Sequence, residues 1–160
     1  MMERWKILPN AKKAEEKLKE SEEQFRDLFE NSSDLICTHD LDGNLLLANN
    51  AAEKFTGYTK EELLKLKLQD ILVPENRIFF KDYLTKIVAA GKAEGIMIIQ
   101  TKNGKRRIWE YKNSLRTENL ASPIIRGRAK DITEQKRVET ELRESEEGLE
   151  KIISPSGVVL

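Results

Sequence analysis

Apolar residues recur at alternating intervals of four and three near both ends of the chain, and most positions between them are Lys or Glu. Such a seven-residue repeat places the apolar side chains in one narrow stripe along a helix. The sequence therefore predicts two amphipathic helices of coiled-coil type, at residues 11–31 and 134–152. The stripe positions that we expect to mediate dimerisation are Leu18, Phe25 and Leu28 in the first helix and Val138, Leu142 and Leu149 in the second.

A stripe of about three heptads is too short to hold a stable helix by itself, so each helix needs a partner. A second copy of the chain is the simplest partner, and we expect a homodimer. The alternative for the first helix is that it packs on its own domain, because Phe29, beside Leu28, widens its apolar face.

The two helical segments are also copies of one another. Residues 18–29 read LKESEEQFRDLF, and residues 142–153 read LRESEEGLEKII. A repeat this long corresponds to one domain with its connector, and we interpret the chain as one unit of a tandem array. The expected divisions are an N-terminal connecting helix at 1–21, a domain at 22–133, a C-terminal helix at 134–153 and the start of the next unit at 154–160.

Between the flanking helices, the chain first predicts a hairpin and then several helices. Strands at 35–39 and 45–48 flank Asp42-Gly43, a dipeptide typical of tight turns. Asn49-Asn50 offers a cap for a helix at 51–56 that stops at Gly57, and Thr59 with Glu62 has the form of a capping box for a helical turn at 62–66. Pro74 is expected to open a longer helix at 74–89, which Gly91 ends. In the last of these helices, the positions that we expect to face the core are Ile78, Phe79, Tyr83, Ile87 and Val88.

The last third of the domain predicts three more strands, at 96–101, 107–115 and 124–130. Asn103-Gly104 supplies a tight turn between the first two of them. Charged residues alternate with small or apolar ones in the last strand, which predicts one solvent-facing and one core-facing side. The order of strands, helices and strands indicates an α+β domain, in which a five-stranded antiparallel sheet carries the helices on one face.

Composition narrows the classes of function. Lys and Arg together number 28, as do Asp and Glu, so the formal net charge is zero and favours neither nucleic acid nor an anionic membrane. No apolar run approaches the ~20 residues of a membrane span. No signal peptide opens the chain. We therefore expect a cytoplasmic module without direct membrane contact, in a parent that itself can be membrane-anchored.

Four short motifs, in the right order, resemble the PAS family of sensory domains over about residues 22–133. They are Asp40-Leu41-Asp42-Gly43 with the following Asn49, then Phe55-Thr56-Gly57-Tyr58-Thr59, then Asp70-Ile71-Leu72-Val73-Pro74-Glu75-Asn76, and finally Asp131-Ile132-Thr133. The resemblance implies a PAS-like sensor followed by a signalling helix, in a parent similar to the histidine kinases of two-component systems. The partners that it implies are adjacent PAS and output domains.

Residue types in this chain do not match the family's covalent flavin and haem branches. The light-oxygen-voltage branch uses a Cys on a central helix, and residues 60–90 contain none. The haem branch commonly uses a His on the long helix, and residues 74–90 contain none. Lys65 and Val73 stand where the family often has Gly and His. These differences weaken any inference from the family about which ligand this chain binds. We expect either a non-covalent small molecule or no ligand.

A ligand cavity, if the domain has one, is expected between the sheet and the helices. The side chains that we expect to line it are Phe55, Leu68, Phe80, Tyr83, Met97, Trp109 and Tyr111. The alternative is that these residues fill the core completely, because a small domain needs most of its aromatic residues to reach native packing density.

Cys37, His39 and Asp40 do not form an expected catalytic or metal site. In a strand, positions 37 and 39 share one face and position 40 lies on the other, so the acid cannot orient the imidazole of a nucleophilic triad. One Cys and one His also leave a tetrahedral metal centre two ligands short. With no phosphate-binding Gly-rich loop and no phosphoacceptor His in a helix, we expect the chain not to be an enzyme.

Basic residues gather at one predicted hairpin tip, at Lys102, Lys105, Arg106 and Arg107. No aromatic residues are interleaved with them, so we expect solvated side chains and no nucleic-acid site.

The segment Asp131-Ile132-Thr133 joins the last strand to the C-terminal helix and is our candidate for signal transmission. Asp131 and Thr133 both suit a helix N-cap, and Asp131 with Glu134 has the spacing of a capping box. A cue that alters core packing is expected to move the last strands and change the register or tilt of the helix. The alternatives are that Asp131 is only a cap and that the domain is a ligand-free spacer for dimers.

Overall fold

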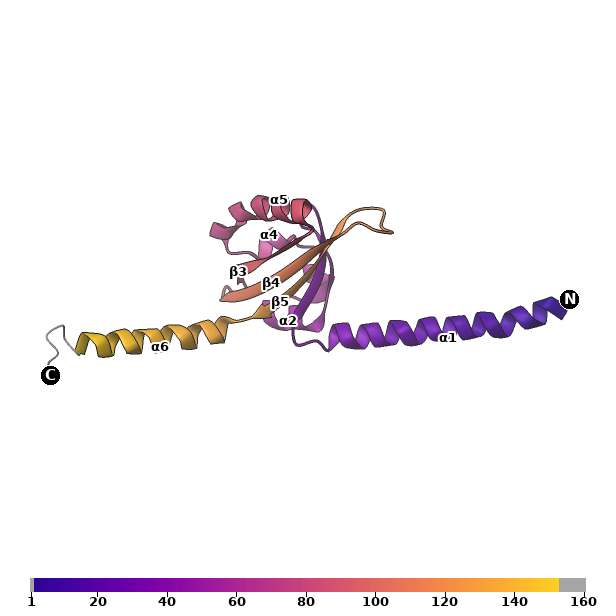
Figure 1. The fold of residues 1–160 in the computed structure, drawn as a ribbon, viewed down its shortest axis with the longest axis horizontal. Helices are drawn as coiled ribbons and strands as arrows, with labels where there is room; N and C mark the ends of the chain where they lie inside the picture. The colour runs from indigo at the N-terminus through magenta and orange to yellow at the C-terminus, as the bar shows by residue number, and fades with distance from the viewer. Residues whose placement is uncertain (1, 153–160) are drawn as a thin grey trace.

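The computed structural model describes residues 2–152, with side chains described between residues 9 and 150. The predicted start of a following unit, at 154–160, lies outside the described residues. Two long helices flank a domain in which two strands precede a group of helices and three further strands (Figure 1). The elements are α1 (Met2–Glu30), β1 (Leu35–Asp40), β2 (Leu45–Ala48), α2 (Asn50–Thr56), α3 (Lys60–Leu63), α4 (Leu68–Ile71), the 3-10 helix η1 (Pro74–Phe79), α5 (Phe80–Ala90), β3 (Lys92–Gln100), β4 (Arg106–Arg116), β5 (Ile124–Asp131) and α6 (Thr133–Ile152).

The five strands form one antiparallel sheet in the order β2-β1-β5-β4-β3. β5 is the central strand, and Ala129 within it lies opposite both Leu35 of β1 and Tyr111 of β4. The last residue of β5, Asp131, pairs with Trp109 of β4. Because β5 leads directly into α6, the centre of the sheet is connected by the main chain to the C-terminal helix.

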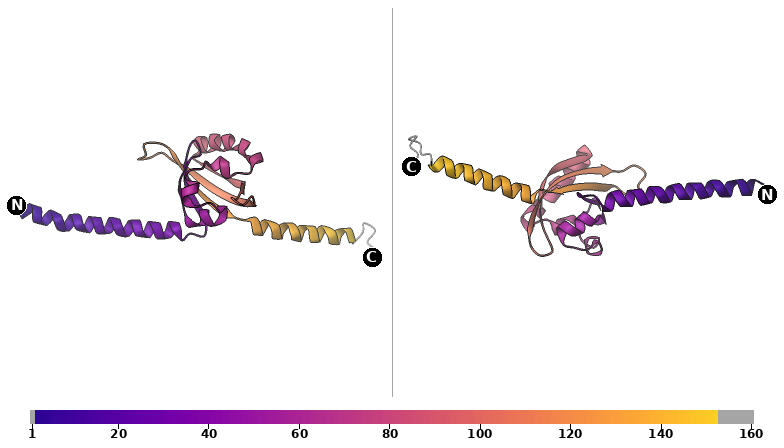
Figure 2. Two further views of the ribbon diagram at one scale, coloured as in Figure 1. Left: turned by 180° about the vertical axis from the view of Figure 1, so that it is seen from behind. Right: turned by 90° about the horizontal axis from the view of Figure 1, so that it is seen from below.

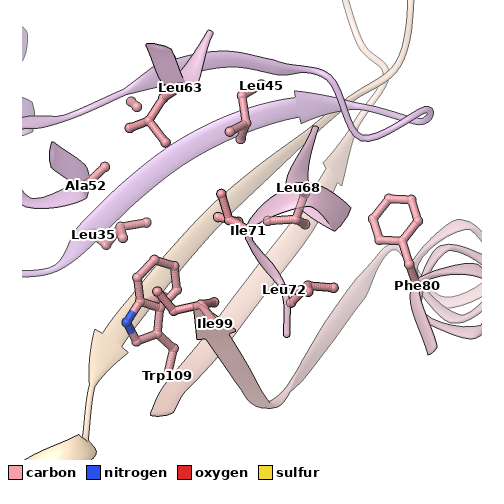
Figure 3. Close-up of a cluster of buried hydrophobic side chains, with 12 residues drawn as sticks. Leu35, Leu45, Ala52, Leu63, Leu68, Ile71, Leu72, Phe80, Ile99 and Trp109 are labelled. Atoms are coloured by element: carbon pink, nitrogen blue, oxygen red, sulfur yellow. The ribbon is translucent and has the colours of Figure 1, made fainter. Parts of the chain in front are cut away.

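The short helices lie on one face of the sheet and bury a single apolar cluster against it (Figure 3). On the opposite face, Arg126 and Arg128 of β5 point into solvent, as the alternating pattern predicts. The predicted α+β architecture is therefore confirmed. The main apolar members of the cluster are Leu35, Leu45, Ala52, Leu63, Leu68, Ile71, Leu72, Phe80, Ile99 and Trp109.

Local capping residues set the helix ends where the sequence predicts them. The Asn49 side chain accepts a hydrogen bond from the N–H of Ala52 at the start of α2, and α2 ends at Gly57 in the left-handed region (φ 78°). Thr59 and Glu62 form the predicted capping box at the start of α3. α5 ends at Gly91, also left-handed, with φ 77°.

The two flanking helices project from the domain in opposite directions along its long axis (Figures 1 and 2). In α1 the stripe residues Leu18, Phe25 and Leu28 are 61%, 61% and 74% exposed. The alternative that α1 packs along its own domain is therefore wrong for this stripe. Only the last turn is anchored, where Phe29 is 7% exposed.

The long helix predicted at 74–89 differs from the structure in its first turns. Residues 74–79 form a 3-10 helix, and the α-helix begins only at Phe80. A 3-10 helix has about 3.0 residues per turn instead of 3.6, so the core-facing phase shifts. The prediction that Ile78, Phe79 and Val88 face the core is wrong, because they are 76%, 60% and 55% exposed. Ile87, another predicted core position, is fully buried, and Phe80 is buried in place of Phe79.

Two shorter helices also depart from the sequence prediction. The helix expected at 62–66 begins earlier, at Lys60, directly after its Thr59 cap. The one-turn helix α4, Leu68–Ile71, was not predicted, because four residues are too few to show a helical period.

Candidate functional site

The junction between β5 and α6 is held against β4 by a compact hydrogen-bond network. The Asp131 carboxylate accepts from Arg107 Nε at 2.7 Å and from Trp109 Nε1 at 3.1 Å, both through Oδ2. Its Oδ1 accepts from the N–H of Thr133, the first residue of α6, at 3.0 Å. We call Arg107, Ile108, Trp109 and residues 131–133 the C-terminal joint.

The main chain of β4 adds two more bonds to the C-terminal joint. The N–H of Ile108 donates to Thr133 Oγ1 at 2.9 Å, and the carbonyl of Ile108 accepts from the N–H of Ile132 at 2.9 Å. One strand residue therefore binds both residues that enter α6. The capping-box bond from Glu134 is replaced by an ion pair, because the Glu134 carboxylate binds Arg137 within the helix.

The Asp131 carboxylate is well shielded, with its side chain 6% exposed. Burial alone would raise the pKa of Asp131. The hydrogen bonds from Arg107 and Thr133, together with the positive charge of Arg107, outweigh burial and hold the pKa of this carboxyl below its ordinary value. Asp131 is thus a negative charge at neutral pH that ties β4 to the start of α6.

A second buried polar side chain performs the same task at the other end of the domain. Asn49 is 0% exposed, and its Oδ1 accepts from the N–H groups of Ile36 and Ala52 at 3.0 and 3.2 Å. Its Nδ2 donates to the carbonyls of Phe29 and Asp34, both at 2.9 Å. Asn49 therefore connects the end of α1, the start of β1 and the start of α2.

The end of α1 is also fixed to the helices by charge. Lys60 Nζ binds the Glu30 carboxylate at 2.6 Å, and Glu30 Oε2 accepts from the N–H of Asn50 at 3.0 Å. With Asn49, these contacts form what we call the N-terminal joint. The sequence indicates Asn49 only as a helix cap, because its bonds to α1 join residues that are distant along the chain.

A cavity of about 300 Å³ lies between α5 and strands β3 and β4. Of the seven predicted lining residues, the structure places five around it: Leu68, Phe80, Tyr83, Met97 and Tyr111. Tyr83 lies edge-on to Tyr111, with ring centroids 5.8 Å apart. Asn76, Asp82 and Lys86 also line the cavity, so its wall combines aromatic rings with a few polar groups.

The other two predicted lining residues lie elsewhere. Trp109 is 2% exposed within the apolar cluster, where Figure 3 shows it beside Ile99. Its indole N–H serves the C-terminal joint instead of the cavity. Phe55 lines a second cavity, also of about 300 Å³, between α2 and the β3–β4 turn.

Tyr83 connects the first cavity to a buried polar chain between α5 and the sheet. Its hydroxyl oxygen accepts from Asn113 Nδ2 at 2.6 Å and lies 3.2 Å from His39 Nε2. His39 Nδ1 lies 2.8 Å from the main-chain carbonyl of Asp40, which can only accept, so Nδ1 carries the proton and Nε2 accepts from Tyr83. The hydrogen bonds of this polar chain therefore all run one way, with Asn113 donating to Tyr83 and Tyr83 donating to His39.

Burial controls protonation in this polar chain. It lowers the pKa of His39, although the Asp40 carbonyl and carboxylate oppose the shift, so the imidazole is neutral at pH 7. Burial likewise raises the pKa of Tyr83, against the hydrogen bond from Asn113. His39 thereby links β1 to α5.

Cys37 and Asp40 are engaged in structural roles. Burial raises the pKa of the Cys37 thiol to about 12, so the thiol stays protonated at neutral pH. The Asp40 carboxylate accepts from the N–H groups of Asp42 and Asn44 and holds the β1–β2 turn. Within residues 2–152, no group of three or more His, Cys, Asp and Glu side chains is placed to hold a metal ion.

Lys102, Lys105 and Arg106 of the basic hairpin cluster are exposed, as expected, and two of them also form ion pairs. Lys102 pairs with Glu62 at 2.8 Å, Arg106 pairs with Glu75, and Arg107 belongs to the C-terminal joint. Lys105 and Arg107 also line the second cavity, together with Lys54, Phe55, Gly57, Thr101 and Asn103. We call this second cavity the basic pocket.

The stripe residues predicted to mediate dimerisation are all exposed in the single chain. Val138, Leu142 and Leu149 of α6 are 51%, 60% and 56% exposed, comparable to the stripe of α1. In the part of the chain that the structure describes, no helix has the length and apolar character to span a bilayer.

Comparison with known proteins identifies the fold. The model of the PAS fold family matches residues 23–132. The PAS domain of an HTR-like protein from Haloarcula marismortui has the same fold, with a TM-score of 0.68 over 76% of this chain and 99% of that chain, at 20% identity.

Curated relatives are long signalling proteins. Sporulation kinase E of Bacillus subtilis (strain 168) is 36% identical over 140 residues, which cover 85% of this chain and 18% of the relative. Sensor histidine kinase TmoS of Ectopseudomonas mendocina is 30% identical over 136 residues, which cover 82% of this chain and 14% of the relative. The chain thus spans less than a fifth of the length of these relatives.

Proposed function

The chain belongs to the PAS family, and on that premise we propose that it is a sensory module that passes a change in its core to a following domain through α6. The observation that carries the proposal is the C-terminal joint. Asp131 accepts from two side chains of β4 and from the first N–H of α6, so strand and helix share one carboxylate. A shift of β4 relative to β5 must break or redirect these bonds.

The cavity supplies a place where a cue acts on β4. Met97 and Tyr111 line it, and Tyr111 is two residues from Trp109 along the same strand. A small molecule against Tyr83 and Tyr111 changes packing between α5 and β4. The route from that contact to α6 is short, because β4 itself carries Arg107, Ile108 and Trp109 of the joint. We propose a mainly apolar ligand with a polar group, held non-covalently.

The exposed stripes support a parallel proposal about assembly. Two copies that pair their α6 stripes, and their α1 stripes, bury apolar surface that is open in the single chain. A homodimer then converts a tilt of α6 into a changed helix register. Within a tandem array, the next unit or an output domain receives that change.

The relatives favour a histidine kinase as the parent, since two of them carry kinase names. We propose that the module itself performs no catalysis and that any phosphotransfer belongs to other domains of the parent. We further propose that the module acts on the cytoplasmic side of the cell.

A fusion experiment tests the sensory proposal. Residues 1–152 are joined in continuous heptad register to a histidine-kinase catalytic unit, and autophosphorylation is measured. Met97→Trp, which fills the cavity, is expected to change kinase output at least threefold, whereas Lys92→Trp at the exposed start of β3 is expected to leave it unchanged. Circular dichroism verifies that both fusions are folded. Equal output from a folded Met97→Trp fusion and the unsubstituted fusion contradicts the proposal.

The competing function is a ligand-free spacer. A bound ligand that stays with the purified protein distinguishes the sensor from the spacer. Native mass spectrometry of the purified module is expected to show a non-protein mass in the unsubstituted chain and its loss in Met97→Trp. A folded dimer without any added mass, combined with unchanged kinase output, favours the spacer.

A further inference from the structure

The basic pocket has a donor-rich lining that the sensory proposal leaves unused. Its polar side chains are Lys54, Thr101, Asn103, Lys105 and Arg107, and no Asp or Glu is among the residues that line it. The cavity has a volume of about 300 Å³, within the range of small-molecule sites in proteins.

The donors of the basic pocket lack protein acceptors. Among the described residues, no carboxylate lies within ion-pair distance of Lys54 or Lys105. Arg107 uses only its Nε for Asp131, which leaves both Nη groups without a protein acceptor in the described part of the chain. The Thr101 hydroxyl oxygen accepts from the N–H of Lys105, so its proton is free to donate. The natural complement of such a lining is a molecule rich in acceptors.

An aromatic ring forms one wall between the charges. Lys54 Nζ lies 5.6 Å from the centroid of the Phe55 ring, and the Arg107 guanidinium carbon lies 5.8 Å from it. The two cations are thus held on the same ring by cation–π attraction. Both cations line the pocket, so they raise the positive potential inside it.

The nearest acid does not cancel this potential. Asp131 borders the pocket through Arg107, but its carboxylate already accepts from Arg107, Trp109 and Thr133. Glu62, another neighbouring acid, is paired with Lys102 outside the lining, and Glu134, whose charge also interacts with Arg107, is paired with Arg137.

We propose that the basic pocket binds a small oxyanion, a carboxylate or a phosphate, and that Arg107 couples its occupancy to the C-terminal joint. The anion occupies the space between Lys54, Lys105 and the free Nη groups of Arg107. The negative charge of an anion at the Nη groups weakens the attraction between the guanidinium and Asp131, and so loosens the tie between β4 and α6. The site is separate from the cavity beside Tyr83, so it gives the module a second input that does not depend on the first.

Titrations with inorganic phosphate and with benzoate test the site, at constant ionic strength set with chloride. Binding is followed by NMR through the Arg107 Nε–H signal and the main-chain amides of Gly57 and Asn103. We expect saturable shifts with at least one of the two anions, and the stronger binder distinguishes a phosphate from a carboxylate ligand. Shifts that follow chloride equally well, or no saturation with either anion, overturn the proposal.

Two double variants with the same loss of charge test whether the anion binds in the basic pocket. Lys54→Gln with Lys105→Gln is expected to weaken binding at least tenfold. Lys81→Gln with Lys92→Gln removes the same charge from α5 and from the far end of β3, and is expected to leave binding within twofold. If both double variants weaken anion binding equally, the anion is attracted only by the overall positive charge, and the proposed site is wrong.

Amide exchange in α6 tests the coupling. With saturating anion, exchange of the first two turns of α6 is expected to accelerate at least twofold, and the acceleration is expected to vanish in the Lys54 and Lys105 variant. Saturable binding with unchanged exchange in α6 contradicts the coupling through Arg107. Neither result depends on whether the first cavity holds a ligand, so the two proposals fail independently.

Discussion

Three buried polar side chains, Asn49, His39 and Asp131, tie the separate elements of the domain together. Asn49 and Asp131 each make hydrogen bonds to at least two elements that the sequence separates, and His39 of β1 bonds to Tyr83 of α5. A buried polar group is costly unless its bonds are made, so each of these side chains favours one relative placement of its neighbours. Asn49 and Asp131 do this at the two ends where the long helices leave.

His39 predicts a pH dependence of stability that can be assigned to one residue, because it is the only histidine in the chain. Its pKa is lowered by burial, so the folded state keeps the imidazole neutral while the unfolded chain takes up a proton. Stability is therefore full above the ordinary pKa near 6.5 and is lost as the pH falls below it, at up to about 1.4 kcal/mol per pH unit.

Urea unfolding between about pH 8 and pH 5 measures this loss. His39→Gln retains a donor and an acceptor but does not titrate, so its stability is expected to be flat over the same range. Parallel pH profiles for the two proteins rule out the assignment to His39.

Asp131→Asn is expected to lower the free energy of unfolding by about 1–3 kcal/mol at pH 7, because it weakens a shielded ion pair and a helix cap together. Asp34→Asn is the matched control, since Asp34 pairs with Arg128 at 2.5 Å but Arg128 is 70% exposed. The control is expected to cost less than about 1 kcal/mol. Equal losses in urea unfolding contradict the special position of Asp131.

The lowered pKa of Asp131 also predicts how the free energy of unfolding changes at acid pH. Because the pKa is lowered in the fold, the stabilisation by Asp131 is present above its ordinary value of about 4 and is lost as the pH falls further. The unsubstituted protein is expected to lose stability more steeply than Asp131→Asn below about pH 4.

Helices α1 and α6 differ from the rest of the fold in that their apolar stripes have no partner within the described chain. Leu142, for example, is 60% exposed. Such helices are marginal in water unless the stripe is buried. Pairing with a second copy removes this exposure and gives α6 a fixed surface on which to shift.

A substitution in the α6 stripe tests the pairing. Leu142→Glu is expected to weaken dimerisation at least tenfold in analytical ultracentrifugation and to reduce helix content, because it places a charge in the seam. Glu147→Leu changes an exposed position on the side of the helix opposite the stripe and is expected to leave the dissociation constant within about threefold. A monomeric unsubstituted protein, or a Leu142→Glu variant with unchanged affinity, contradicts pairing through the stripe.

Sequence patterns predict the elements whose signals are local. The caps Asn49 and Thr59, the left-handed Gly57 and Gly91, and the alternation in β5 are all properties of a few neighbouring residues. The start of α5 was not predicted, because Ile78 and Phe79 of the preceding 3-10 helix are exposed, so their apolar character does not mark a core-facing side.

The candidate sites show the same limit. Five of the predicted cavity residues meet because family likeness supplied their places in the fold. Phe55 was assigned to the wrong cavity, since its neighbours Lys105 and Arg107 come from a distant hairpin. The partners of Asp131 on β4 and the network between His39 and Tyr83 also depend on strand order, which local sequence does not encode.

The domain is a compact core between the helices α1 and α6, which leave it in opposite directions (Figure 2). A buried polar side chain holds each helix where it meets the domain, and strands β1, β5 and β4 of the sheet connect these two places. The core also holds two cavities, one beside Tyr83 and one beside Arg107. The proposed sensory function therefore requires that a change in packing beside Tyr83 alter the position of α6 through Asp131.

The distance between the two α6 helices of the dimer measures this requirement most directly. A spin label at Glu146→Cys reports it by double electron–electron resonance in a Cys37→Ala background, which removes the only native cysteine. Tyr83→Phe removes one hydroxyl from the network beside the cavity, and Tyr58→Phe is its control. The account predicts a shifted distance distribution in Tyr83→Phe only, and loss of that shift when Asp131→Asn is added. An identical distribution in the unsubstituted protein and Tyr83→Phe, or a shift that persists with Asp131→Asn, contradicts it.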